Sequence, residues 1–153
     1  MIVSFNTKTN MHLECLVNLC NTSSLAKLFE YQLSFIKPGN AIINQPYKDC
    51  LTQSCGFVHG GVIATIADTV GGFAANSLSK EYYFATGEFK INFLERSEPK
   101  TLKSFGTVIK KGAKIMVCEL KVFCDDKLVA IGIGSYIITS LKFSEIENYK
   151  RTD

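Results

Sequence analysis

The acidic residue Asp68 lies in an almost entirely apolar stretch of this sequence. It is the only charged residue between positions 62 and 75, and the apolar residues around it recur at the i, i+3, i+4, i+7 spacing of a helix. Most other positions in the stretch are also apolar or small, which is typical of a helix that the rest of the protein surrounds. Because an ionised carboxylate in such a place is unfavourable unless it is hydrogen-bonded or partly hydrated, Asp68 is a candidate general base or nucleophile.

Two glycines, Gly60 and Gly61, stand where this helix is expected to begin. The first backbone N–H groups of a helix have no partner within it, and glycine leaves them unobstructed by a Cβ, so they are suited to polarising a carbonyl group. His59 precedes the pair, and we expect it to hold the loop around Gly60 in shape rather than to act as a base. A second pair, Gly71-Gly72, lies in mid-helix at a cost of roughly 1 kcal/mol each, which predicts close packing of another element there.

Asp68 and the Gly60 N–H group together supply what thioester hydrolysis requires, namely an activated water or a carboxylate nucleophile and a polarised carbonyl. Eight residues separate them, so at a rise of ~1.5 Å per residue they lie about 12 Å apart along one helix. Reacting groups must approach within about 3–3.5 Å. If both residues act on one carbonyl, Gly60 of one subunit must face Asp68 of another, which predicts a two-fold dimer with two shared sites.

The residues before this helix predict a short helix and a β-hairpin. Residues 11–19 have near-helical spacing with Asn10 as a candidate cap, and residues 21–24 end that helix. A strand is expected over residues 29–35, and a turn at 38–40 joins it to a strand over 41–47. Four side chains alternate on one face of the first strand: Phe29, Tyr31, Leu33 and Phe35.

The residues after the helix predict a meander of long strands. In the first of them, Phe89, Ile91 and Phe93 alternate with Lys90 and Asn92, so the two sets are expected on opposite faces. The strands are expected over residues 82–94, 102–110, 114–124 and 128–140. One long apolar helix between a hairpin and a meander indicates an α+β fold in which a curved antiparallel sheet wraps the helix. We expect one domain over residues 1–153, with an N-terminal helical extension (1–28) and a charged tail (141–153) that forms a short surface helix.

Composition excludes several classes of protein. The chain has 153 residues, 46% of them hydrophobic and 20% charged, which is ordinary globular material. The net charge of +3 is mild and the basic residues are scattered, so no nucleic-acid partner is expected. Six cysteines without a C-x-x-C pair, and only two histidines, do not predict a metal site. The apolar runs are too short to span a membrane and no signal peptide is evident, so we expect reduced thiols and a cytoplasmic location.

The motif Gln53-x5-His59-Gly60-Gly61-x6-Asp68, followed by the segment TGEFKINFL that begins at Thr86, resembles the hotdog-fold acyl-CoA thioesterases. Among them it is most similar to the phenylacetyl-CoA thioesterase branch of the 4-hydroxybenzoyl-CoA thioesterase superfamily. The resemblance covers roughly residues 30–140. It implies a hotdog fold, an acyl-CoA substrate, no metal or redox cofactor, and a homodimer that pairs further into a homotetramer.

The same resemblance implies a role for each motif residue. Asp68 would be the general base or nucleophile, and the Gly60 N–H would bind the thioester carbonyl. Gln53 would position water or the carbonyl, and Thr86 would orient the attacking water. His59 and Gly61 would complete the substrate-binding start of the helix.

Two other functions remain open at this stage. A hotdog hydratase or dehydratase would act on enoyl or 3-hydroxyacyl thioesters, using a catalytic histidine. A non-catalytic acyl-CoA-binding protein would keep the fold and the groove without turnover. The sequence does not identify the acyl group. Several aromatic side chains would favour medium or aromatic acyl chains: Phe57, Phe73, Tyr82, Tyr83 and Phe84.

Overall fold

A computed structural model describes residues 11–150 and contains three α-helices and six strands within that range. The long apolar segment forms helix α3, Gly60–Asn76, as its periodicity predicted. The helices before it are α1 (Met11–Asn21) and α2 (Ser24–Phe29). The strands are β1 (Gln32–Lys37), β2 (Asn40–Gln45), β3 (Tyr82–Phe93), β4 (Leu102–Lys111), β5 (Ile115–Cys124) and β6 (Lys127–Lys142).

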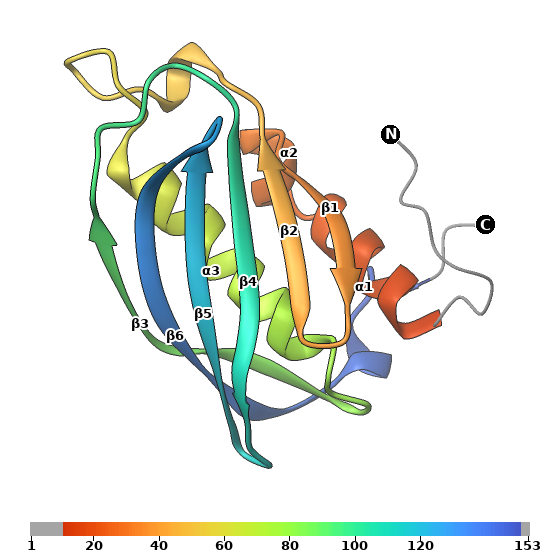
Figure 1. Ribbon diagram of the computed structural model, residues 1–153. Helices are drawn as coiled ribbons and strands as arrows, with labels where there is room; N and C mark the ends of the chain where they lie inside the picture. The colour runs from red at the N-terminus through yellow and green to blue at the C-terminus, as the bar shows by residue number, and fades with distance from the viewer. Residues whose placement is uncertain (1–10, 151–153) are drawn as a thin grey trace.

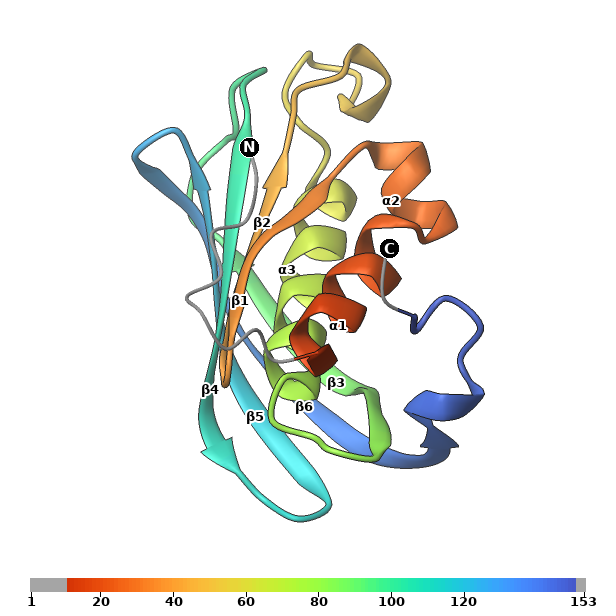
Figure 2. The ribbon, with the colours of Figure 1, turned by 90° about the vertical axis from the view of Figure 1, so that its right-hand side faces the viewer.

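The six strands form one antiparallel sheet in the order β1-β2-β4-β5-β6-β3. The sheet curves around α3, and Figures 1 and 2 show α1 and α2 on the same side of the sheet as α3. This is the predicted α+β hotdog arrangement, with the long helix packed against a curved sheet. The two edges of the sheet are β1 and β3, and β3 follows α3 directly.

The core lies between α3 and the concave face of the sheet. The side chains of Ile66 and Val70 are fully buried there against Leu120 and Val122. The close approach that the glycines of α3 predicted is present, because a Cβ placed on Gly71 would lie 2.5 Å from Cδ2 of Leu120. Helix and sheet therefore pack at a distance that only a residue without a side chain permits at this position.

The region before β1 differs from the prediction. Phe29 belongs to helix α2 rather than to a strand. Ser23 caps this helix, with its hydroxyl accepting a hydrogen bond from the Ala26 N–H at 3.1 Å, and Glu30 ends it in a left-handed conformation with φ of 62°. The apparent alternation from Phe29 to Tyr31 thus spans a helix end and a strand start.

The predicted face of β1 is also wrong at one residue. Leu33 is buried, but the pairing of β1 with β2 shifts between Leu33 and Phe35, and Phe35 is exposed. A bulge adds one residue to the strand, so the side chains after it point to the opposite face.

The remaining boundaries follow the sequence closely. The hairpin turn contains Gly39 in a left-handed conformation with φ of 79°, as the turn between β1 and β2 requires. The tail forms a single 3-10 turn, Phe143–Glu145, rather than a surface α-helix, and Phe143 is buried against the core. The predicted cap at Asn10 and the first ten residues lie outside the described range.

Candidate active site

The carboxylate of Asp68 contacts the edge strand β3. Asp68 lies in the middle of α3, and its Oδ1 accepts a hydrogen bond of 2.8 Å from the hydroxyl of Thr86. The two residues are 18 positions apart in sequence, and the structure brings them together because β3 returns along α3. The structure therefore brings together two of the residues that the motif singled out, the acid on the helix and the hydroxyl on the following strand.

Asp68 is half-buried, and its burial raises the pKa of the carboxyl group above the ordinary value. The Thr86 hydroxyl, which donates to the carboxylate, and the nearby Tyr136 hydroxyl favour the ionised form and oppose part of that rise in pKa. A carboxylate that is less stabilised than one at the surface is a stronger base. The environment thus suits Asp68 to accept a proton from water.

Tyr136 is a neighbour of Asp68 that the sequence did not reveal. Its side chain is fully buried, and its hydroxyl donates a hydrogen bond of 2.9 Å to the backbone carbonyl of Asp68. Glycines make the space for this hydroxyl, because a Cβ on Gly71 would lie 2.1 Å from it and a Cβ on Gly134 would lie 2.8 Å from it. The sequence does contain a signal for this close contact between helix and sheet: a glycine pair in the middle of the helix, together with Gly132-Ile-Gly134 in the last strand.

The start of α3 presents one N–H group without a partner. Within residues 11–150, no hydrogen-bond acceptor is found for the Gly60 N–H. The Gly61 N–H, in contrast, donates to Nδ1 of His59 at 2.8 Å, so His59 is the N-cap of the helix. The structure therefore distinguishes the two glycines. Gly60 retains a donor that can meet a carbonyl oxygen, whereas the Gly61 donor is occupied by the histidine.

Gln53 lies in the loop that leads into α3. Its side-chain Oε1 accepts a hydrogen bond of 3.3 Å from the Cys55 N–H, and its backbone pairs with Phe57 across a tight turn. The loop is tied to the helix start by the His59 N–H, which donates to the Leu51 carbonyl at 2.9 Å. In the described part of the chain, no hydrogen bond connects Gln53 with Asp68.

The predicted residues thus form two half-sites within one chain. The base half-site consists of Asp68 and Thr86. The donor half-site consists of Gly60, His59 and Gln53. Eight helical residues, or about 12 Å of rise, separate Asp68 from Gly60, so one chain does not bring both halves to one reacting carbon.

Residues 11–150 can be compared with what a metal site, a reactive thiol or a membrane helix requires. No group of three or more histidine, cysteine, aspartate or glutamate residues in this range is arranged to hold a metal ion. Four of the cysteines are buried and two, Cys50 and Cys55, are exposed. None of the helices over these residues has the length and apolar character needed to cross a membrane.

Comparison with known proteins assigns this architecture to a family. Residues 55–131 match the family described as the thioesterase superfamily. A protein of Saccharolobus solfataricus, whose name assigns it provisionally to the esterases, is 34% identical over 117 residues, which cover 76% of this chain and 84% of that protein. The chain belongs to the thioesterase superfamily.

Solved structures agree with this assignment. A thioesterase family protein from Silicibacter pomeroyi matches with a TM-score of 0.78 and 26% identity, over 83% of this chain and 97% of the other. The Escherichia coli PaaI protein, from the phenylacetic acid degradation operon, has the same fold with a TM-score of 0.78 and 19% identity, over 87% of this chain and 99% of the other. The segment matched to the thioesterase superfamily contains Gly60, Asp68 and Thr86, while Gln53 lies just before it.

Proposed function

We propose that this member of the thioesterase superfamily hydrolyses an acyl-CoA to the free acid and coenzyme A. The observation that carries the proposal is the half-buried carboxylate of Asp68, held by the Thr86 hydroxyl at 2.8 Å beside an exposed sheet edge. Membership of the thioesterase superfamily supports a thioester as substrate. The closer resemblance to the phenylacetyl-CoA branch stays a proposal.

In the proposed reaction, the thioester carbonyl oxygen accepts a hydrogen bond from the Gly60 N–H. Asp68 acts as general base, taking a proton from water while the water oxygen forms a bond to the carbonyl carbon, or it attacks that carbon itself as a nucleophile. In both routes the C–S bond then breaks and the thiolate of coenzyme A takes up a proton, which in the general-base route is the proton held by Asp68. In the nucleophilic route, water then hydrolyses the mixed anhydride of the acyl group with Asp68, which releases the free acid and restores the carboxylate. Thr86 orients the carboxylate and the water, and Gln53 positions the water or the carbonyl. His59 keeps Gly60 at the helix start.

The free edge of the sheet supports a site shared between two subunits. Among residues 11–150, strand β3 (twelve residues) has one neighbour, β6, and its other edge is unpaired. Long unpaired edges favour pairing with another strand. Asp68 contacts this strand at Thr86, to which it is hydrogen-bonded. Gly60 contacts the strand at its far end, where the ring of Phe93 rests against Gly60. Whatever pairs with β3 therefore comes next to both half-sites.

A bulge makes the two ends of β3 face the same way. Residues seven apart in a regular strand point to opposite faces. The pairing of β3 with β6 shifts between Thr86 and Glu88, which places Thr86 opposite Tyr136 and Phe93 opposite Ala130, both on the side of α3. If two copies of β3 pair antiparallel about Lys90, Phe89 of each lies across from the partner's Ile91, and the extra residue of the bulge leaves Thr86 and Gly87 together across from the partner's Phe93. Asp68 then meets Gly60 of the partner subunit.

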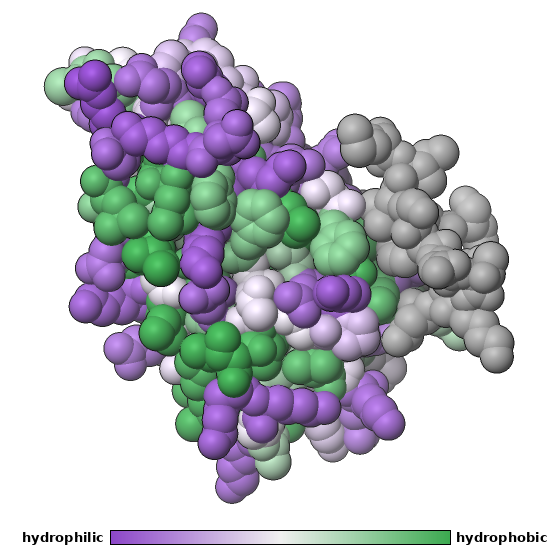
Figure 3. Space-filling model, viewed as in Figure 1, coloured by the Kyte–Doolittle hydropathy of each residue, from purple (hydrophilic) through white to green (hydrophobic). Residues whose placement is uncertain are grey.

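The outer face of the sheet supports further pairing of such dimers into a homotetramer. Three isoleucines, Ile109, Ile133 and Ile137, are exposed on this face. Figure 3 shows apolar side chains gathered in two areas over the sheet, with polar side chains between them. The Lys121–Glu119 ion pair, at 2.6 Å, lies on the same face. The solution mass, measured by light scattering, distinguishes monomer, dimer and tetramer.

The first experiment measures thiol release from a panel of acyl-CoA thioesters by the wild-type protein and by D68N. Asparagine has the shape of aspartate but cannot accept a proton, so we expect turnover to fall by a factor of about 10³ or more. Unchanged turnover in D68N would remove Asp68 from the mechanism. Hydration of crotonyl-CoA without thiol release would establish the hydratase alternative, and binding without any turnover would establish a non-catalytic acyl-CoA-binding protein.

The second experiment tests whether two subunits share each site. Gly60→Pro removes the N–H but is compatible with the first position of a helix, and Gly60→Ala is the matched control that keeps the N–H. D68N and G60P are each expected to be inactive. In a mixed dimer, one site combines Asp68 of one subunit with Gly60 of the other and is intact. Refolding an equal mixture should therefore recover about one quarter of wild-type activity, since half of the dimers are mixed and each has one working site. No recovery would show that each site lies within one chain.

A further inference from the structure

Strand β3 carries an apolar stripe on the side that faces α3. The stripe consists of Phe89, Ile91 and Phe93, which pair with Gly134, Gly132 and Ala130 of β6. Phe89 and Ile91 pack partly buried against the core, and Phe93 is 52% exposed. The intervening side chains, Lys90 and Asn92, are exposed on the opposite face, as the sequence predicted. The free edge of the sheet thus presents a continuous apolar surface toward the helix.

The stripe begins at Gly60, whose N–H is the candidate hydrogen-bond donor to the thioester carbonyl. A Cβ placed on Gly60 would lie 3.4 Å from Cζ and 3.5 Å from Cε1 of Phe93, so the edge of the ring rests against the backbone of Gly60. A carbonyl group that accepts the Gly60 N–H would have its substituents within van der Waals reach of this ring. Phe93 is therefore placed to contact an atom bonded to that carbonyl.

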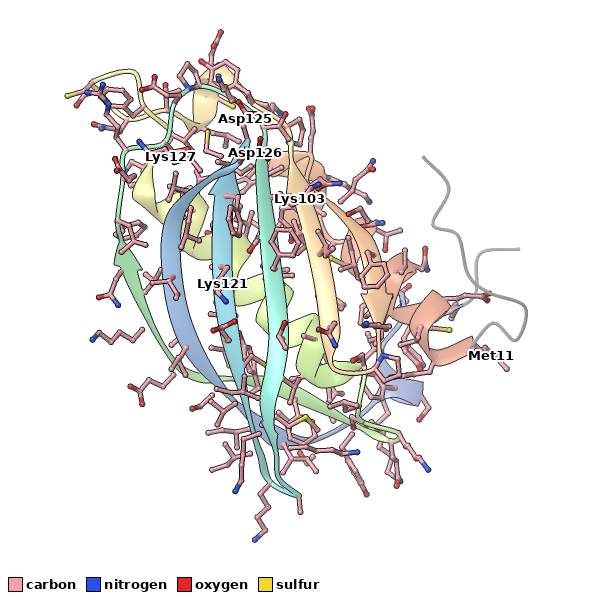
Figure 4. All side chains as sticks on the ribbon, viewed as in Figure 1. Met11, Lys103, Lys121, Asp125, Asp126 and Lys127 are labelled. Atoms are coloured by element: carbon pink, nitrogen blue, oxygen red, sulfur yellow. The ribbon has the colours of Figure 1, made fainter. Side chains whose placement is uncertain are left out.

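The two directions away from Gly60 differ in polarity. Beyond the end of β3 lie charged side chains in ion pairs, with Lys127 2.9 Å from Glu95 and Lys100 2.8 Å from Asp125. Arg96 stands over the ring of Phe57, 5.0 Å from its centroid. Asp125, Asp126 and Lys127 mark this end of the sheet in Figure 4, and a hollow of about 560 Å³ opens among these charged residues. In the other direction the apolar stripe leads along β3 toward Phe89.

We propose that the acyl chain of the substrate lies along this stripe, and that Phe93 and Ile91 select the acyl group. The inference rests on the proposed thioesterase function. The charged nucleotide part of coenzyme A suits the polar end, which leaves the apolar direction for the acyl chain. The selecting residues therefore differ from the aromatic set expected from the sequence, in which Phe84 is buried in the core and Tyr83 packs edge-on against Phe143.

The stripe also limits the length of the acyl chain that the site accepts. If two copies of β3 pair about Lys90, the stripes of the two subunits run toward each other and meet there. The distance from Phe93 to that point is three residues of strand, or about 10 Å. An unbranched acyl chain of medium length fits this path, whereas a palmitoyl chain is longer than the path. The substrate class is thus medium-chain, unbranched acyl thioesters.

The test compares acetyl-, hexanoyl- and palmitoyl-CoA as substrates for the wild type, F93A, I91F and N92A. The wild type should have a higher kcat/KM for hexanoyl-CoA than for the other two. F93A removes the ring beside the carbonyl and I91F obstructs the path, so each should lower the ratio of hexanoyl to acetyl kcat/KM by about tenfold. Asn92 is adjacent but on the opposite face, so N92A is the matched control and should leave the ratio unchanged.

Several results would overturn the inference while leaving the thioesterase proposal intact. Equal losses for every acyl group in F93A and I91F would indicate that the two side chains only stabilise the fold. Palmitoyl-CoA hydrolysed as well as hexanoyl-CoA would refute the length limit. Repeating the panel with N-acetylcysteamine thioesters should preserve the acyl ratios, and ratios that disappear with the smaller thiol would place the thiol rather than the acyl chain on the stripe. Failure of the wild type to release thiol from any substrate refutes the thioesterase function itself.

Discussion

The hydroxyl of Tyr136 lies directly beneath the turn of α3 that carries Asp68, and it donates a hydrogen bond of 2.9 Å to the Asp68 backbone carbonyl. The two residues are 68 positions apart and belong to the helix and to strand β6. Gly71 and Gly134 are the residues whose missing side chains admit the hydroxyl. The glycines of the apolar helix, unfavourable for a helix in isolation, thus serve to bring a buried donor under the candidate catalytic acid.

The variant Tyr136→Phe should separate the structural and electrostatic effects of this hydroxyl. Loss of one buried hydrogen bond should lower the free energy of unfolding by about 1 kcal/mol. Because the hydroxyl favours the ionised form of Asp68, its removal should raise the pKa of Asp68 further and move the acidic limb of the kcat/KM profile to higher pH. Tyr47→Phe, which removes an exposed hydroxyl bonded to Asp49, is the control and should leave the profile in place.

Alanine at the two mid-helix glycines should have opposite effects on stability. A Cβ on Gly71 would lie 2.1 Å from the Tyr136 hydroxyl and 2.5 Å from Leu120, so Gly71→Ala should destabilise the fold by about 1–3 kcal/mol. The nearest atom to a Cβ on Gly72 is 3.5 Å away, which is an ordinary contact, so Gly72→Ala should be neutral or stabilising by up to about 1 kcal/mol. Urea denaturation of both variants measures the difference. Equal effects would contradict the close-packing explanation.

The sequence predicted those helices and strands in which apolar residues recur at a regular spacing. Helix α3 and the strands after it have long, regular patterns, and their boundaries agree with the structure to within a few residues. Helix α2 was missed because it has only six residues and is defined by its caps, Ser23 and Glu30, rather than by an apolar face. The bulge after Leu33 was missed because an inserted residue leaves no mark in composition.

The residues of the candidate site that the sequence singled out are either local, as at the helix start, or named by the family motif, as Thr86 is. Gly60 and His59 lie at one helix start, and the motif placed them correctly together. The bulge between Thr86 and Glu88 and the hydroxyl of Tyr136 depend on pairing between β3 and β6, which are far apart in the chain. Such contacts are set by the whole sheet, so a local pattern does not reveal them.

Replacing Thr86 should change the pH dependence of activity in a predictable direction. The Thr86 hydroxyl donates to the Asp68 carboxylate and thereby lowers the pKa of Asp68. Thr86→Val removes the donor at nearly constant shape, so the pKa rises and the acidic limb of the kcat/KM profile moves to higher pH. At neutral pH we expect a loss of about tenfold, as for one hydrogen bond to a charged group. Thr86→Ser keeps the hydroxyl and should retain the wild-type profile. An unshifted profile in Thr86→Val would show that the hydrogen bond does not influence the base.

The substitution Asp68→Asn should stabilise the folded protein at neutral pH. The pKa of Asp68 in the fold is raised above its ordinary value of 3.8 by burial, so the folded state binds the proton more tightly than the unfolded state. The stabilisation that this gives is fully present below pH 3.8 and is lost as the pH rises through the raised pKa. Asparagine is never ionised and can still accept the Thr86 hydrogen bond. The free energy of unfolding of D68N should therefore match that of the wild type in acid and exceed it at pH 7, as measured by urea denaturation. If D68N were less stable than the wild type at pH 7, the Asp68 carboxylate would contribute to the stability of the fold. That result would contradict the view that this carboxylate is kept for catalysis at a cost in stability.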